Sequence, residues 1–130
     1  RRFEAALEEV LGFFQADPAR AQLLLRELLD RPKAFEARLK RHLGHWIALV
    51  IGYIRRGQDE GLIHPEVDPY AYVLHVVAMM VTATAASPVT SSLLQPHTDE
   101  HDTTGRDTLD RSIQELVRMA RYGLFIHPER

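Results

Sequence analysis

The sequence predicts an all-α domain, and three observations support that prediction. Apolar residues recur every three or four positions over long stretches, and no strand-like alternation of useful length is present. Proline and glycine separate these stretches at positions where helices commonly begin or end. The chain has 130 residues, of which 45% are hydrophobic and 26% charged, so it is long enough to bury one core. We therefore expect a single globular domain over residues 1–130.

Five helices are predicted, over residues 3–15, 19–29, 33–60, 70–86 and 106–123. Asp17-Pro18 and Asp68-Pro69 predict helix starts, because aspartate caps a helix and proline suits its first turn. Gly61 is placed to end the third helix. Residues 87–105 contain serines, prolines and a polar run, so we expect a mobile loop there.

Glycines 44, 52 and 57 lie inside the third predicted helix, where each weakens the helix by up to about 1 kcal/mol relative to alanine. The benefit that we expect from them is close approach by a neighbouring helix or by a ligand.

The fourth predicted helix carries no charged side chain from Tyr70 onward. A helix that is apolar nearly all round must be buried nearly all round. In a domain with so few helices, something has to cover the outer face of this one. A second copy of the chain is the simplest cover, so the pattern favours a homodimer.

Composition excludes several classes of protein. The net charge of −2 provides no general attraction to nucleic acid or to an anionic membrane. The absence of cysteine excludes disulfides, thiolate metal sites and cysteine nucleophiles, and it fits a cytoplasmic protein. The chain starts without methionine inside a helical pattern, which indicates a fragment, and no signal peptide is present. The long uncharged run 70–96 is broken by polar residues and proline, so we expect no membrane span.

Metal and enzyme chemistry find little support. His42 and His45 are spaced to reach one metal ion from a helix, but two surface histidines explain them more simply. Acidic and histidine residues crowd the predicted loop and could bind a divalent cation, although a solvated turn is the simpler interpretation; they are His97, Asp99, Glu100, His101 and Asp102. We expect no cofactor, no metal and no enzymatic activity. A metal-dependent helical enzyme that uses the histidines as ligands remains the least favoured hypothesis for this chain.

Two segments resemble a known family. "RELLDRP" at 26–32 and "YIRRGQDEGLIHPEVDPYAYVLHVV" at 53–77 are similar to the middle of TetR-type transcription regulators, with the recurrent turn at Gly57, Gly61, Asp68 and Pro69. The resemblance implies a five-helix C-terminal regulatory domain that binds a small, largely apolar effector. It also implies dimerisation through the last two helices as a four-helix bundle. DNA binding, and with it a repressor role, would belong to an N-terminal helix-turn-helix domain that this chain lacks.

The resemblance also assigns roles along the chain. Residues 1–62 would mainly form the effector pocket, and residues 68–124 would mainly form the dimer interface. The pocket candidates are aromatic and amphipathic residues: Phe13, Phe14, His42, Trp46, Tyr53, Tyr72, His75 and Met79. The interface candidates are the apolar stripes of the two late helices: Val73, Val77, Val81, Leu109, Ile113, Leu116, Val117 and Ala120. The alternative is a helical dimerisation module with a filled core and no ligand, in which all of these residues are simply core or interface.

Overall fold

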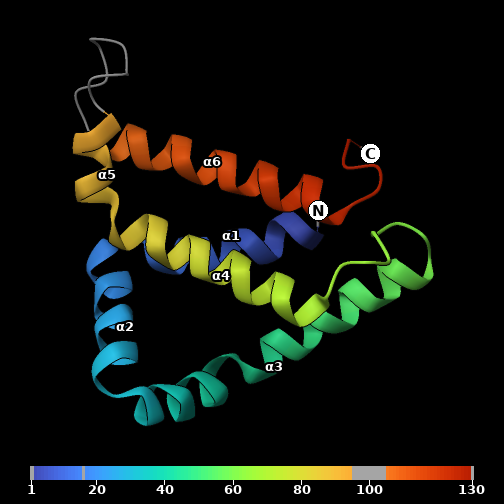
Figure 1. Ribbon diagram of the computed structural model, residues 1–130, viewed down its shortest axis with the longest axis horizontal. Coiled ribbons are helices and arrows are strands. Elements are labelled where there is room, and N and C mark those ends of the chain that lie inside the picture. Colours follow the sequence, from blue (N-terminus) through green and yellow to red (C-terminus); the bar gives the residue numbers. More distant parts are fainter. Residues whose placement is uncertain (1, 16, 95–104, 130) are drawn as a thin grey trace.

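The computed structural model describes residues 2–15, 17–94 and 105–129 as an arrangement of helices (Figure 1). In chain order, these are α1 (Arg2–Gln15), α2 (Pro18–Asp30), α3 (Pro32–Asp59), α4 (Pro69–Ala85), α5 (Ser87–Leu94) and α6 (Gly105–Leu124). The all-α prediction is confirmed. No helix in the described part of the chain is both long and apolar enough to cross a membrane.

Aspartate caps begin two of the helices, as the sequence predicts. The Asp17 carboxylate accepts a hydrogen bond from the Ala19 amide at 3.0 Å, with Pro18 in the first turn of α2. The Asp68 carboxylate accepts from the first two free amides of α4, at 3.0 and 3.2 Å. Each cap satisfies donors that the first helical turn leaves without partners.

α4 is the central helix of the fold, because it contacts each of the other five described helices. α4 and α6 run side by side, with α1 behind them (Figure 1). Two groups of buried side chains form the core. The α1 cluster consists of Leu7, Leu11, Val76, Met80, Ile113, Leu116 and Ala120. The α3 cluster consists of Ile51, Ile54, Ile63, Val73 and Leu124.

The turn between α3 and α4 is fastened to the end of α6. Gly61 has a φ of +75°, the left-handed conformation that ends a helix, so its predicted role is confirmed. Beyond it, the His64 amide donates to the Leu124 carbonyl and the Ile126 amide donates to the Leu62 carbonyl, both at 3.0 Å. These bonds hold the turn against the end of α6 and the residues that follow it. Near them, the Phe3 ring of α1 meets the Phe125 ring edge-on at 5.3 Å between centroids.

The predicted loop 87–105 is wrong over its first part, where the structure has α5, so six helices replace the predicted five in the described chain. The reason lies in the Ser-Pro pair, which we interpreted as loop punctuation but which equally suits the first turn of a helix. Here Ser87 is 8% exposed, and the Thr90 hydroxyl donates back to the Ala86 carbonyl at 3.1 Å. Residues 95–104, the rest of the predicted mobile loop, lie outside the described residues.

Candidate functional site

Four of the pocket candidates lie on inward flanks of α3 and α4, but they do not share one site. Trp46 and Tyr53 are half-buried on α3 and pack against the α3 cluster. Met79 is half-buried on α4 and packs against the α1 cluster, while Tyr72 packs against both. Tyr72 already has a polar partner, because its hydroxyl donates to the Ala120 carbonyl at 2.6 Å.

The other four candidates are placed differently. His42 and His75 are exposed, so neither imidazole belongs to the interior of the chain. Phe13 and Phe14 lie in α1, but their side chains are outside the described part of the structure.

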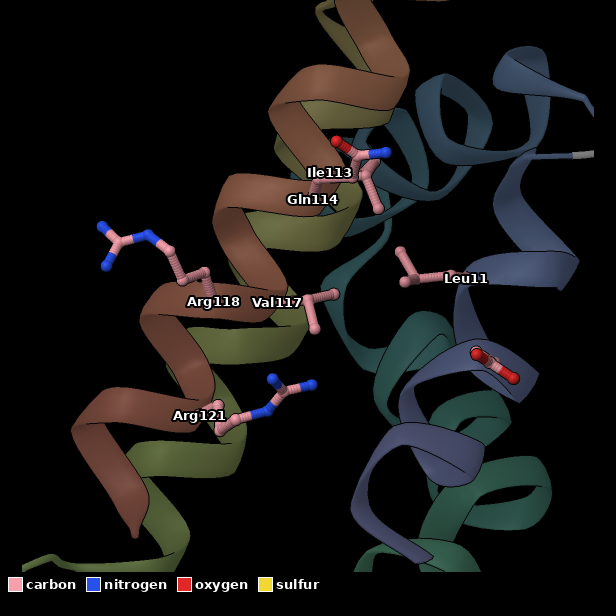
Figure 2. A pocket seen from close by; sticks show the side chains of 7 residues that line it. Leu11, Ile113, Gln114, Val117, Arg118 and Arg121 are labelled. Carbon is pink, nitrogen blue, oxygen red and sulfur yellow. The ribbon is translucent and has the colours of Figure 1, made fainter. Parts of the chain in front are cut away.

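A groove lies elsewhere, between α1 and α6 (Figure 2). It has a volume of about 410 Å³, within the range typical of sites for small molecules. Its lining consists of Glu8, Leu11, Ile113, Gln114, Val117, Arg118 and Arg121. None of the six pocket candidates whose side chains the structure describes is in this lining.

The groove has an apolar floor and a charged rim. In Figure 2, Leu11, Ile113 and Val117 point into the space between the two helices, and Arg121 reaches toward it from α6. Arg118 points away, and its guanidinium donates to the Glu115 carboxylate at 3.0 Å. The rim therefore carries both signs of charge, from Glu8 and Arg121, and charge alone selects no class of ligand.

Sequence reasoning missed this groove because the polar side chains of its rim occupy the charged side of an amphipathic helix. Periodicity distinguishes the buried side of α6 from the exposed side. It does not show where two helices diverge enough to leave a groove between them.

The interface candidates also divide by burial. Four of them already lie in the core of one chain: Val73 is 6% exposed, Ile113 5%, Leu116 6% and Ala120 3%. The remaining four, Val77, Val81, Leu109 and Val117, are half-buried. Four of the candidates are thus packed within the single chain, and the other four keep part of their surface accessible.

Other residues of the same two helices form what we call the outer surface, defined as the exposed positions Leu74, His75, Ala78 and Thr82 of α4 with Ser112, Glu115, Met119 and Tyr122 of α6. Apart from the adjacent pair Leu74 and His75, they recur at spacings of three and four, so each set lies on one side of its helix. Leu74 is 66% exposed, Met119 52% and Tyr122 46%. These three large side chains therefore remain exposed on two helices that contact each other.

Electrostatics at the two helices follow from these contacts. Burial raises the pKa of the Tyr72 phenol far above its ordinary value, because the phenolate would lose hydration. The hydrogen bond from Arg118 lowers the pKa of the exposed Glu115 carboxyl. No group of three or more histidine and acidic side chains suited to a metal ion occurs in the described part, and the five metal candidates of 97–102 lie outside it.

Comparison with known proteins gives one match. A family model described as "Tetracyclin repressor-like, C-terminal domain" matches residues 23–101, which is more than half of the chain. The match begins within α2, includes α3, α4 and α5, and ends before α6. No curated protein and no solved structure matches the chain.

Proposed function

The chain belongs to the tetracyclin repressor-like C-terminal domain family. On that basis we propose that it is the ligand-sensing and homodimerising part of a cytoplasmic transcription regulator. We propose further that this regulator is a repressor and that the domain has no enzymatic activity. The outer surface carries this proposal. It provides the exposed apolar contacts on α4 and α6 that pairing with a second copy requires.

Pairing would complete the burial of α4. Its inner side is in the core, at Val73, Val76 and Met80, whereas Leu74 and Ala78 on its outer side are exposed. In a dimer, α4 and α6 of both chains would pack as four helices with these side chains between them. Burial of such residues stabilises the pair by about 25 cal/mol for each Å² of apolar surface removed from water.

Sedimentation equilibrium tests the dimer. The wild-type chain is expected to dimerise at tens of micromolar, and Met119→Glu is expected to shift it toward monomer by placing a charge in the interface. Leu29→Glu is the matched control, because Leu29 is 80% exposed on α2, outside the outer surface. A monomeric wild-type chain would contradict the proposal. If Met119→Glu and Leu29→Glu dimerise equally well, the interface lies on a surface other than the outer surface.

For sensing, we propose a small, largely apolar effector that contacts the α3 aromatic residues Trp46 and Tyr53. Both are half-buried, and both bring a polar atom to an apolar surface, which suits a ligand site. The groove between α1 and α6 is a second possible location.

Trp46 is the only tryptophan of the chain, so its fluorescence reports on the α3 location. Compounds that raise the melting temperature are expected to change Trp46 emission and to lose their effect in Tyr53→Ala. Val117→Ala changes the lining of the groove between α1 and α6 and so tests that location. Stabilisation that survives Tyr53→Ala but disappears in Val117→Ala would place the effector between α1 and α6 instead.

One observation favours the alternative of an interaction module without a ligand. Trp46 and Tyr53 pack against buried side chains, as core residues do, and neither lines the described groove. If no compound in a broad screen stabilises the dimer, this alternative replaces the sensing proposal.

DNA contact is proposed to occur only through a helix-turn-helix domain joined to this one. The net charge of −2 supports this, because binding to the phosphate backbone depends on positive charge. A small molecule would then act by favouring one arrangement of the paired domains over another. Gel-shift assays of the 130-residue chain with DNA are expected to show no complex at physiological salt.

A further inference from the structure

A hydrogen bond ties α4 to α6 in the middle of the fold. The Tyr72 hydroxyl of α4 donates to the Ala120 carbonyl oxygen of α6 over 2.6 Å. The Tyr72 ring packs against both core clusters, and Ala120 is 3% exposed. A short bond between partly desolvated groups has a narrow range of geometries, so it fixes how far apart the two helices lie and how they are aligned.

This bond joins the two helices that carry the outer surface. His75, an exposed residue of that surface, is three positions after Tyr72 and therefore on the neighbouring turn of α4. Met119, another, precedes Ala120 in α6 and is 52% exposed. The two halves of the outer surface thus come from different helices, and the Tyr72–Ala120 bond joins those helices.

We infer that Tyr72 is a positioning residue for dimerisation, acting without touching the partner. This inference rests on the proposed dimer through the outer surface. A pair of helices held at fixed spacing presents its outer side chains already arranged, so association costs less conformational entropy. Without the hydroxyl, α4 and α6 can shift relative to each other, and the partner chain has to bind a surface that is less well ordered.

The test compares dimer dissociation constants of the wild-type chain, Tyr72→Phe and Ile54→Val, measured by sedimentation equilibrium well below the melting temperatures. Tyr72→Phe keeps the packed ring and removes only the hydroxyl, so it is expected to fold, which circular dichroism verifies. Ile54 is 1% exposed in the α3 cluster, and Ile54→Val removes one methylene there. Loss of a buried methylene lowers stability by about as much as loss of one hydrogen bond, which makes the control matched.

Tyr72→Phe is expected to weaken dimerisation by up to about fivefold, whereas Ile54→Val leaves it unchanged. One net hydrogen bond sets this limit, because the bond lies within one chain and affects association only through the order of α4 and α6. Hydrogen exchange at the α6 amides provides a second measurement, and Tyr72→Phe is expected to accelerate it around Ala120. An unchanged dissociation constant for Tyr72→Phe, or equal weakening by Ile54→Val, overturns the positioning role while leaving the dimer intact. A monomeric wild-type chain would instead refute the proposed function.

Discussion

Ile63 fills the space in which a side chain on Gly57 would lie. A β-carbon built on Gly57 meets the Cδ1 atom of Ile63 in a forbidden overlap, and the Cγ1 atom at 2.8 Å. Gly57 is buried in the last turns of α3, and Ile63 is 1% exposed in the turn that follows. Glycine is therefore required at this position by the folding of the turn back onto its own helix.

Gly57→Ala is expected to destabilise the domain by about 1–3 kcal/mol, because Ile63 would have to leave its buried site. The loss would occur even though alanine favours a helix by about 1 kcal/mol over glycine. Gly52→Ala is the control in the same helix, since nothing lies within 4 Å of its added β-carbon, and it is expected to be neutral or stabilising. Urea unfolding of both variants measures the difference, and equal stability of the two would contradict the role of Ile63.

This pair also shows how far the sequence determines the fold. Glycines 44, 52 and 57 all predict close approach of another part of the molecule to α3. Of these three, only Gly57 has a described atom within 4 Å of a β-carbon built on it. That neighbour belongs to the following turn and is neither a helix nor a ligand. Helix starts at Asp17 and Asp68 could be predicted because a cap is a local interaction. Contacts such as that between Gly57 and Ile63 depend on the path of the turn, which periodicity does not contain.

Gln58→Glu is expected to loosen the turn between α3 and α4. The Gln58 amide nitrogen donates to the carbonyl oxygens of His64 and Val67, at 3.1 and 2.8 Å. A carboxylate cannot donate and would repel both oxygens, so we expect a loss of about 1–3 kcal/mol in the free energy of unfolding at neutral pH. Chemical denaturation of the wild-type chain and of Gln58→Glu measures this loss in the free energy of unfolding.

Gln114→Glu makes the same chemical change on the exposed side of α6 and serves as the control for Gln58→Glu. Part of the stability of Gln58→Glu should return in mild acid, where a protonated carboxyl can donate one hydrogen bond. Identical stabilities of the two variants at neutral pH would show that the bridging amide contributes nothing to the turn.

Asp68→Ala is expected to cost about 0.5–2 kcal/mol by removing the cap of α4. Asp17→Ala removes the cap of α2, where the carboxylate accepts from a single amide. Because Asp68 accepts from both Tyr70 and Ala71, and because α4 contacts every other described helix, its loss should be the larger of the two. Melting temperatures of the two variants decide this, and a larger loss for Asp17→Ala would contradict the central role assigned to α4.

The candidate site could be predicted only in outline. The apolar pattern of α4 indicated a helix that needs cover, but it could not distinguish residues that face the core from those that remain exposed in the single chain. Val73 and Leu74 are adjacent in sequence and equally apolar, yet they are 6% and 66% exposed. The distinction depends on where α3 and α6 lie around α4. The same is true of the groove, since Gln114 and Arg121 line it only because α1 and α6 diverge.

Alkaline pH provides a test of the environment of Tyr72. Burial raises the pKa of its phenol above the ordinary value of 10.0, so the folded chain retains the proton where the unfolded chain releases it. The stabilising contribution of the neutral hydroxyl is therefore complete below about pH 10 and is lost as the pH rises above that value. Unfolding free energies of the wild-type chain and Tyr72→Phe, compared from about pH 8 to about pH 11, should converge, because the variant has no phenol to ionise. The other three tyrosines are common to both chains and cancel in the difference. A constant difference over this range would show that the Tyr72 phenol has the same pKa in the folded and unfolded states, and that burial does not affect it.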